Sequence, residues 1–411
     1  MRSFGTALVR LTVIAAALAA SLTSASLTSA SLTSSALAKA STPTCQPWNQ
    51  VQPGSGTLVG AAVLPDCEEW AVGENSQQTL ALHLFGQGWT QVPSPDPGGK
   101  NRGNTLASVA ATGSSSGWAV GNYSNGKTSR TLILRWDGAV WSRVASPNPG
   151  GPKNAAALFG VAALKTRSAP GARTAWAVGN YRNGKARRTL ILGWNGKNWT
   201  QVPSPNPGGP THDSRLTSVA VVSARDAWAA GYYQTAQVFR RTLILHWNGK
   251  NWTRVPSPDP GGPSNGNLLF GVAATSASDA WAVGYDTSRS GATTLVLHWN
   301  GKRWSRMQSP DKATGANPRI DQLQGVTATS ADNAWAVGYY QLSGAGFYTL
   351  ILHWNGKFWH AQSSPNPAGD NDFLLNVAAS SASSAWAVGG SSNGFGEQNL
   401  VLHWNGTTWQ S

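Results

Sequence analysis

Five of the seven histidines recur at one position of a repeated phrase, directly before a Trp or Leu; they are His83, His246, His298, His353 and His403. Imidazole is the commonest side-chain metal ligand, so recurring histidines raise the question of a metal centre. The same position holds Arg135 and Gly193 in two other copies of the phrase, and it falls on a strand that would lie away from the axis of a ring of repeats. We therefore expect neither a metal nor a cofactor, and predict that these rings hydrogen-bond to neighbouring backbone.

Hydrolysis of a glycosidic bond requires a pair of carboxyl groups about 5 to 9.5 Å apart. The chain has four glutamates. Two of them, Glu74 and Glu397, follow a recurring Trp-Ala-Val-Gly phrase, which we call the landmark, in the first and last repeats. If the first and last repeats adjoin, these carboxyl groups would adjoin as well, which leaves a glycan hydrolase or lyase as one alternative. Exposed loop charges explain them more simply, and the sequence has no Gly-x-Ser-x-Gly elbow and no phosphate-binding loop. The sequence therefore favours a protein that is not an enzyme.

Aromatic and basic residues cluster after the same landmark. We expect all eight tyrosines, Tyr348 included, to lie in or just after the second strand of each repeat, with basic loops following them. Aromatic rings stack on sugars, and Arg forks bind carboxylate or phosphate oxygens. The candidate ligand-binding residues are Tyr123, Tyr181, Arg182, Arg187, Arg188, Tyr232, Tyr233, Arg240, Arg241, Tyr285, Tyr339 and Tyr340.

Two other interpretations of these residues stay open. Tyrosines at strand ends also serve as cross-strand packing residues, and loop arginines are often ordinary solvated charges. The opposite face has its own basic series, Lys197, Lys250, Lys302 and Lys357. The face that binds is therefore undecided at this point.

The elements that must position these residues come from one repeat. The landmark Trp-Ala-Val-Gly, once Trp-Ala-Ala-Gly, occurs at spacings of 48 to 58 residues and begins at Trp70, Trp118, Trp176, Trp228, Trp281, Trp335 and Trp386. Each copy reads as four short strands, which in the fifth are residues 268–275, 279–285, 293–300 and 303–310, with no helical periodicity. Such a repeat must stack on its neighbours to bury both faces. The sequence predicts an all-β, seven-bladed β-propeller of four-stranded antiparallel blades, with the Gly- and Ala-rich strand innermost.

Turn signals and the N-terminal segment complete this assignment. The recurring Asn-Gly predicts a hairpin, because Asn and Gly tolerate the positive φ of a type I′ turn; a two-residue and a four-residue loop both stay open. The Ser-Pro-Asn-Pro-Gly phrase predicts the crossover to the next blade. Trp48 opens a phrase that resembles a fourth strand, and the chain stops at a short "TTWQS". We expect a signal peptide at 1–38, a segment at 39–53 that closes the ring on the last blade, and the propeller at 54–411.

The leader and the charge balance suggest where the protein acts. A basic start and an apolar run too short to span a membrane predict export, and no later segment reaches transmembrane length. A net charge of +14 favours polyanionic partners, either an acidic polysaccharide or a wall polymer at the cell envelope; a protein partner is the alternative, and specific nucleic-acid binding is not expected. Cys45 and Cys67 are expected to form a disulfide, which would contribute roughly 3 kcal/mol. We expect a secreted monomer.

The Ala-Trp-Ala-Val-Gly and Trp-Asn-Gly-x-x-Trp phrases resemble those of exported bacterial repeat proteins described as kelch-like or galactose-oxidase-like β-propellers. They are also similar to Asp-box propellers and to photosystem-assembly propellers. The resemblance covers nearly all of residues 45–411 and implies a propeller. It departs from true kelch repeats in the regular double glycine, which occurs only at Gly389-Gly390. It implies no catalytic residues for this chain.

Overall fold

The computed structural model describes residues 54–64, 68–86, 88–165, 172–237, 239–313, 319–342, 346–369, 371–392, 394 and 396–411. All of them belong to one compact unit, Pro43–Ser411. The expected signal peptide, the expected closing segment with Trp48, and both cysteines lie outside the described residues. The described part of the chain is built from 28 strands, β1 to β28, and contains no helix.

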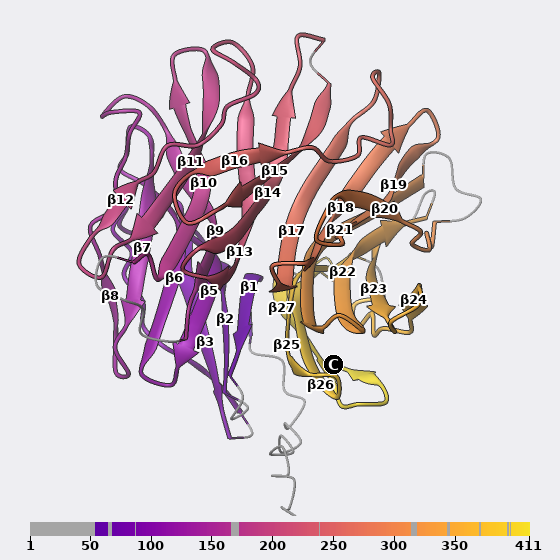
Figure 1. The fold of residues 1–411 in the computed structure, drawn as a ribbon. Helices are drawn as coiled ribbons and strands as arrows, with labels where there is room; N and C mark the ends of the chain where they lie inside the picture. The colour runs from indigo at the N-terminus through magenta and orange to yellow at the C-terminus, as the bar shows by residue number, and fades with distance from the viewer. Residues whose placement is uncertain are drawn as a thin grey trace, which may run out of the picture. The chain divides into compact units, whose positions relative to one another are not determined.

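The strands follow one another as antiparallel sets of four, which we number groups 1 to 7 in chain order (Figure 1). The first strands are β1 (Thr57–Val63), β5 (Asn104–Gly113), β9 (Ala156–Ala163), β13 (Ser214–Ser223), β17 (Asn267–Ser276), β21 (Arg319–Ser330) and β25 (Asp372–Ser381). The second strands are β2 (Glu69–Asn75), β6 (Ser116–Ser124), β10 (Ala175–Asn183), β14 (Asp226–Gln234), β18 (Asp279–Ser288), β22 (Asn333–Gln341) and β26 (Ser384–Ser392).

The remaining strands complete each group. The third strands are β3 (Gln78–Phe85), β7 (Ser129–Trp136), β11 (Ala186–Trp194), β15 (Arg240–Trp247), β19 (Gly291–Trp299), β23 (Phe347–Trp354) and β27 (Glu397–Trp404). The fourth strands are β4 (Gly88–Gln91), β8 (Trp141–Arg143), β12 (Trp199–Gln201), β16 (Trp252–Val255), β20 (Trp304–Met307), β24 (Trp359–Gln362) and β28 (Trp409–Gln410). Five groups are separate four-stranded sheets, and groups 5 and 6 share an eight-stranded sheet through a short parallel pairing of β19 with β21.

The first strands lie side by side in chain order. Each contacts the next, from β1 through β5, β9, β13, β17 and β21 to β25, and β25 also contacts β1. Figure 1 shows the indigo β1 beside the yellow β25 and β27. The approach is close enough to require glycine, because a Cβ at Gly60 would lie 2.7 Å from the Ser108 Cα and one at Gly325 would lie 2.8 Å from the Asn376 Cα. The Gly- and Ala-rich composition of these strands follows from this crowding.

This crowding gives a test at Gly325. A Gly325→Ala change should destabilise the fold by about 1–3 kcal/mol, because the new methyl group overlaps backbone of the adjacent strand. Gly113→Ala is the matched control, since Gly113 lies at the end of another first strand and a Cβ there meets nothing within 4 Å. Urea denaturation of both variants measures the difference. Equal midpoints for the two variants would contradict the close packing of the first strands.

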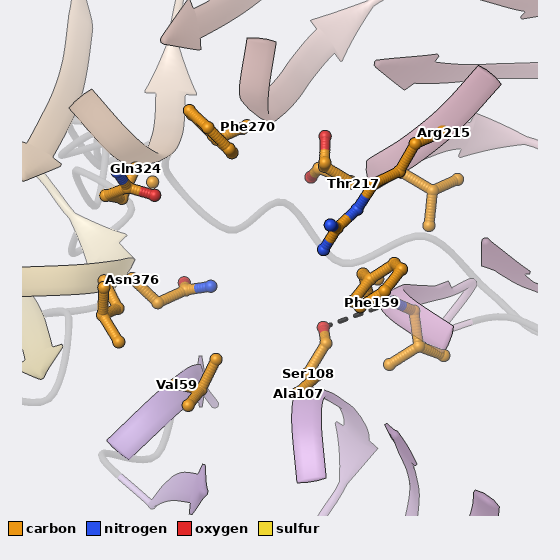
Figure 2. A pocket seen from close by; sticks show the side chains of 16 residues that line it. Val59, Ala107, Ser108, Phe159, Arg215, Thr217, Phe270, Gln324 and Asn376 are labelled. Atoms are coloured by element: carbon orange, nitrogen blue, oxygen red, sulfur yellow. Dashed lines mark hydrogen bonds between the residues drawn. The ribbon is translucent and has the colours of Figure 1, made fainter. Parts of the chain in front are cut away.

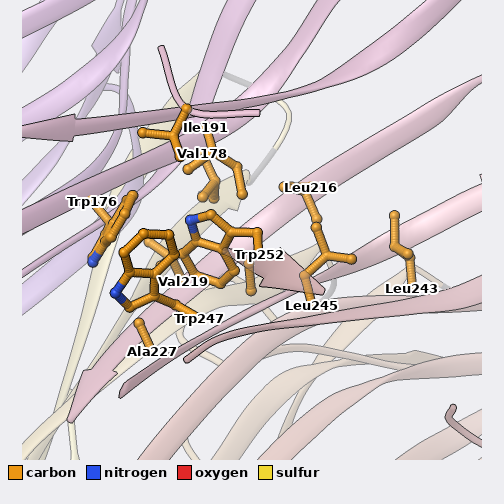
Figure 3. Packing of buried hydrophobic residues seen from close by; sticks show 12 residues of the cluster. Trp176, Val178, Ile191, Leu216, Val219, Ala227, Leu243, Leu245, Trp247 and Trp252 are labelled. Atoms are coloured by element: carbon orange, nitrogen blue, oxygen red, sulfur yellow. The ribbon is translucent and has the colours of Figure 1, made fainter. Parts of the chain in front are cut away.

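Seven hydrophobic clusters fill the space between successive groups, including one between groups 7 and 1. In the cluster of groups 3 and 4, the ring of Trp176 lies 4.8 Å from that of Trp247 and 5.1 Å from that of Trp252 (Figure 3). In the cluster of groups 7 and 1, Trp386 meets Trp89 edge-on at 5.9 Å. The recurring tryptophans are thus the contacts that join one group to the next.

The Asn-Gly turns are four-residue loops, and the predicted type I′ geometry is wrong. Trp194 pairs directly with Trp199 in the ladder, and only Gly196 of the loop has a positive φ, 93°. Asn195 acts through its side chain, whose Oδ1 accepts the backbone N–H groups of Lys197 and Asn198 at 3.0 and 2.8 Å. This Asx-type turn explains why Asp137 replaces Asn in group 2, since its carboxylate accepts the same two bonds.

The Ser-Pro phrase has a structural role that its composition did not reveal. The Ser204 hydroxyl lies 2.8 Å from the Thr189 hydroxyl on β11, and the Asn206 Oδ1 accepts the Thr189 N–H at 2.7 Å. The same hydroxyl pair recurs in groups 1 to 6 at Thr79–Ser94, Thr131–Ser146, Thr242–Ser257, Thr294–Ser309 and Thr349–Ser364. Hydrogen bonds therefore hold each crossover to the third strand of its own group.

The recurring histidines pack against the landmark tryptophans, and their expected bonds to backbone are wrong for three of them. The Nε2 atoms of His246 and His298 lie 3.0 and 2.7 Å from the Oδ1 atoms of Asp226 and Asp279, and that of His353 lies 2.8 Å from the Asn333 Oδ1. The rings of His83 and Trp70 stack 4.3 Å apart. The position is thus part of the packing between second and third strands.

Candidate binding site

The tyrosines of the second strands divide between two faces, because side chains alternate along a strand. Tyr232, Tyr285 and Tyr339 stand four residues after the landmark Trp, and Tyr123, Tyr181, Tyr233 and Tyr340 stand five residues after it. The first set lies at the end of the groups where the second strand turns into the third. Tyr232 lines a groove there, and the ring of Phe270 on β17 lies 6.5 Å from Tyr232 and 5.7 Å from Tyr285.

The second set of tyrosines packs between groups. The Tyr123 hydroxyl accepts a hydrogen bond from Arg143 Nη2 at 2.7 Å, and the Tyr233 hydroxyl accepts one from Arg254 Nη2 at 2.9 Å. Tyr181 packs against the cluster of groups 2 and 3. Tyr340 stacks on Tyr348, which lies on β23, a third strand; the expectation that it follows a second strand is wrong. These rings serve packing, the alternative interpretation of a strand-end tyrosine.

The candidate arginines divide in the same way. Arg241 Nη1 donates to the Gly262 carbonyl at 2.8 Å and so holds the crossover turn. Arg188 has the same ladder position in group 3, opposite Tyr181. Arg187 and Arg240 precede these residues and point to the groove. Arg182 is exposed at the end of β10.

The groove has a volume of about 470 Å³ and lies over groups 2, 3 and 4. Its charged lining consists of Arg187, Asp213, Arg215 and Arg240. Arg187 donates to Asp213 twice, from its backbone N–H at 2.7 Å and from Nη1 at 2.9 Å. The guanidinium of Arg240 lies 5.6 Å from the centre of the Tyr232 ring. One carboxylate therefore faces three guanidinium groups, and the groove is basic.

Arg215 is the residue that sequence reasoning missed. Its guanidinium lies 3.8 Å above the Phe159 ring, its Nε is buried, and it has no hydrogen-bond or ion-pair partner among the described residues. It pairs with Tyr232 across β13 and β14, a ladder position held by Thr, Ala, Leu, Gln or Phe in the other groups. The sequence signal for a binding role of Arg215 is that it is the one charged residue at this ladder position among the seven groups.

Arg215 and Phe159 also line a second space, which we call the central cavity (Figure 2). This cavity has a volume of about 180 Å³ and receives residues from the first strand of every group. Figure 2 shows Arg215 and Val59 on opposite sides of it, with the polar side chains of Gln324 and Asn376 on its wall. Arg215 and Phe159 line both spaces, so the groove and the central cavity adjoin at these two side chains.

Aromatic rings form the wall beside Arg215, over groups 4 to 6. Tyr339 meets Phe347 at 5.1 Å, and its hydroxyl donates to Gln322 Oε1 at 2.9 Å. Burial raises the pKa values of Tyr285 and Tyr339 above the ordinary range, although Arg240 opposes the effect at Tyr285. Both phenols are therefore neutral at physiological pH and act as apolar surface with a hydrogen-bonding tip.

The two glutamates considered for catalysis lie at the same end, on groups 1 and 7. Glu74 pairs with Thr57 in the ladder of β1 and β2, and its Oε2 accepts the Thr105 hydroxyl at 2.8 Å. The Glu397 Oε2 accepts the Thr57 hydroxyl at 2.9 Å. The structure thus brings both carboxyl groups beside the start of β1, each held by a threonine.

Among the described residues, no group of three or more His, Cys, Asp or Glu side chains is arranged to hold a metal ion. The described part also offers no helix with the length and apolarity needed to cross a bilayer.

The four-stranded antiparallel sheets, joined face to face by hydrophobic clusters and with their first strands side by side, define a β-propeller. Solved propeller structures match most of the chain. YCF48 bound to D1 peptide is 14% identical, with 87% of this chain and 96% of that chain covered at a TM-score of 0.51. These values show the fold.

Two glycan-active enzymes also have similar structures. The GH74 xyloglucanase from Xanthomonas campestris is 13% identical over 84% of this chain and 53% of its own, with a TM-score of 0.53. The polysaccharide lyase PL25, an ulvan lyase, bound to -[GlcA(1-4)Rha3S]- is 12% identical over 88% and 97%, with a TM-score of 0.53. No protein-family model and no curated protein sequence matches the chain.

Proposed function

We propose that this chain is an exported, non-enzymatic, seven-bladed β-propeller that binds an acidic glycan, either a polysaccharide or a wall polymer, at the cell envelope. The observation that carries the proposal is Arg215, a cation with no hydrogen-bond or ion-pair partner among the described residues, which stands where the basic groove meets the central cavity. The leader, the Cys45–Cys67 disulfide, the monomeric state and the kinship with kelch-like and Asp-box propellers belong to the same proposal.

Seven blades closed at the N-terminus are supported by contacts between the two ends of the described chain. The Gly56 N–H donates to the Glu397 carbonyl at 3.1 Å, and the Asn399 N–H donates to the Gly54 carbonyl at 2.8 Å. Ser55 forms a bridge with Gln398, and β1 contacts β25, β26 and β27. In this proposal the residues that precede β1 hold the last blade against the first.

Charge and shape both favour an acidic sugar polymer in the groove. Arg187 is paired with Asp213, whereas the described residues offer no carboxylate partner to Arg215 or to Arg240. Burying an unpaired guanidinium costs stability, and a bound carboxylate or sulfate would remove that cost. The face of Tyr232 offers a stacking surface for a sugar ring beside these cations. One of the structural neighbours is a polysaccharide lyase solved with an acidic sugar.

The test is binding of the mature chain to an oligouronic acid, measured by calorimetry at low and near-physiological salt. We expect saturable binding that weakens as salt rises, because polyanion binding depends on charge. The neutral oligosaccharide of the same linkage should bind far more weakly. Absence of binding to every acidic oligosaccharide tried would overturn the proposal.

The decisive variant is Arg215→Met, which keeps the length of the side chain and removes its charge. We expect binding of the oligouronic acid to weaken about 30-fold, equivalent to about 2 kcal/mol. The fold should be kept, since Arg215 has no hydrogen bond or ion pair to lose and Met can still pack on the Phe159 ring. Lys250→Ala, in an exposed turn at the other end of group 4, is the charge control and should bind as the parent chain does. Equal losses in both variants would indicate a general effect of net charge.

The protein-interaction scaffold remains the alternative, since one structural neighbour was solved with a peptide. A protein partner that binds by apolar contacts would keep its affinity as salt rises, which separates it from a polyanion. The enzyme alternative makes a different prediction, because a hydrolase or lyase would shorten the oligouronic acid, and Glu397→Gln would abolish that turnover.

A further inference from the structure

The groove reaches the central cavity from one side. Its lining comes from groups 2, 3 and 4, and its inner end is the pair Arg215 and Phe159, which it shares with the central cavity. Basic side chains therefore line the groove from its outer part, at Arg187 and Arg240, to its inner end at Arg215.

On the far side of the ring of first strands, two carboxylates stand near the start of β1, outside the lining of the central cavity. In the order of contacts between first strands, β1 lies three strands from β13 in one direction and four in the other, so the two strands face each other. Glu74 and Glu397 stand beside the start of β1, where both carboxylates are held by threonine hydroxyls. A chain with only 17 acidic residues against 31 basic ones thus places two carboxylates across the ring of first strands from its half-buried Arg215.

Between these two sides, aromatic rings contact one another over groups 4 to 7. Phe270 stacks on Tyr285, and Tyr339 meets Phe347 and Phe373 at 5.1 and 6.5 Å. A polyanion that crossed the centre would have to leave over carboxylates or over this aromatic wall. Like charges at short range are repelled, so the exit over the two carboxylates does not favour an acidic chain.

We propose that the site recognises the end of an acidic glycan chain and not its interior: the terminal sugar enters the central cavity, its acidic group meets Arg215, and the following sugars lie in the groove. The inference rests on the proposed glycan binding. A cavity of about 180 Å³ exceeds the roughly 150 Å³ of an engineered cavity that holds a benzene ring, which is room for one sugar ring. The two carboxylates act by repulsion and prevent the chain from passing through.

The experiment compares a short oligouronic acid with a tenfold longer fraction of the same polymer, at equal mass of sugar, by calorimetry and by ultracentrifugation of the complexes. End recognition predicts one or two bound proteins per chain at both lengths, and tenfold fewer per unit mass for the long fraction. The free monomeric uronic acid should compete, because it fills the central cavity alone.

The matched variants are Glu74→Gln and Glu397→Gln, alone and combined. Gln keeps an oxygen that accepts the threonine hydroxyl, so the change removes charge and leaves this bond in place. We expect the double variant to bind the interior of the long polymer, with a severalfold rise in proteins bound per chain. Asp332→Asn, an exposed charge at the other end of group 6, should change nothing.

The outcomes are distinguishable. If the parent chain already binds in proportion to the mass of long polymer, end recognition is overturned and glycan binding stands. If the double variant fails to bind along the polymer while the parent binds ends, repulsion by Glu74 and Glu397 is overturned. If no acidic glycan binds at all, the proposed function itself fails.

Discussion

Replacing Trp281 with alanine should lower the free energy of unfolding by about 3–5 kcal/mol, the largest loss we expect from a single substitution. The Trp281 side chain is fully buried. Its ring lies 5.0 Å from Trp354 and 5.2 Å from Trp359, both on the next group, and 4.2 Å from His298 on its own group. Alanine would leave a cavity at the point where groups 5 and 6 meet. Guanidinium denaturation followed by tryptophan fluorescence measures the loss.

Two companion variants separate this cavity from a general effect of losing an aromatic ring. Trp281→Phe keeps most of the ring and removes an indole N–H that has no partner among the described residues, so it should cost less than half as much. Phe358→Ala removes a ring that is 57% exposed and should change stability by less than about 0.5 kcal/mol. A loss at Phe358 that equals the loss at Trp281 would contradict the role of the clusters in joining groups.

The fold was predictable because its information is local and repeated. The landmark phrase, the Asn-Gly turns and the Ser-Pro crossovers each recur at fixed offsets, so a misjudged residue in one copy is corrected by the others. Boundaries were less accurate where a crossover begins: the expected strand at 303–310 ends at Met307, because Ser309 bonds to Thr294 and so belongs to the crossover. The type I′ turn was wrong for a similar reason. The Asn side chain accepts hydrogen bonds from the loop backbone, so the turn does not need a positive φ at Asn.

The site was predictable only in part. Tyr232 and Tyr233 are adjacent, and strand alternation alone implies that they face different ways, so the division of the tyrosines was available from the sequence. For Arg215 the sequence offers only a cation at a position that is uncharged in the other groups; its place beside Phe159 depends on the ladder register of two strands and on the approach of two groups. The central cavity has no local signal either, since it is formed by residues more than 300 positions apart in the chain.

The second large effect we expect is a loss of stability in mild acid, caused by two of the recurring histidines. Burial lowers the pKa of His353 and of His403 from the ordinary 6.5 to about 4, and the neighbouring His360 adds to the effect at His353. In the unfolded chain these rings take up protons at a higher pH than in the folded chain. Their contribution to stability is therefore complete above pH 6.5 and is lost as the pH falls from 6.5 to about 4.

We expect the free energy of unfolding to fall by about 2 kcal/mol between pH 7 and pH 4.5, roughly half of what the full shifts would give, because solvent reaches His353. The matched variant is Asn333→Asp, which gives His353 the carboxylate partner that His246 has in Asp226. A carboxylate favours the protonated ring, so this variant should lose less stability in acid than the parent chain. His353→Gln combined with His403→Gln should flatten the pH dependence further. An acid loss that survives unchanged in both variants would place its origin in carboxylates elsewhere, since a folded-state carboxylate with a lowered pKa also loses its contribution as pH falls.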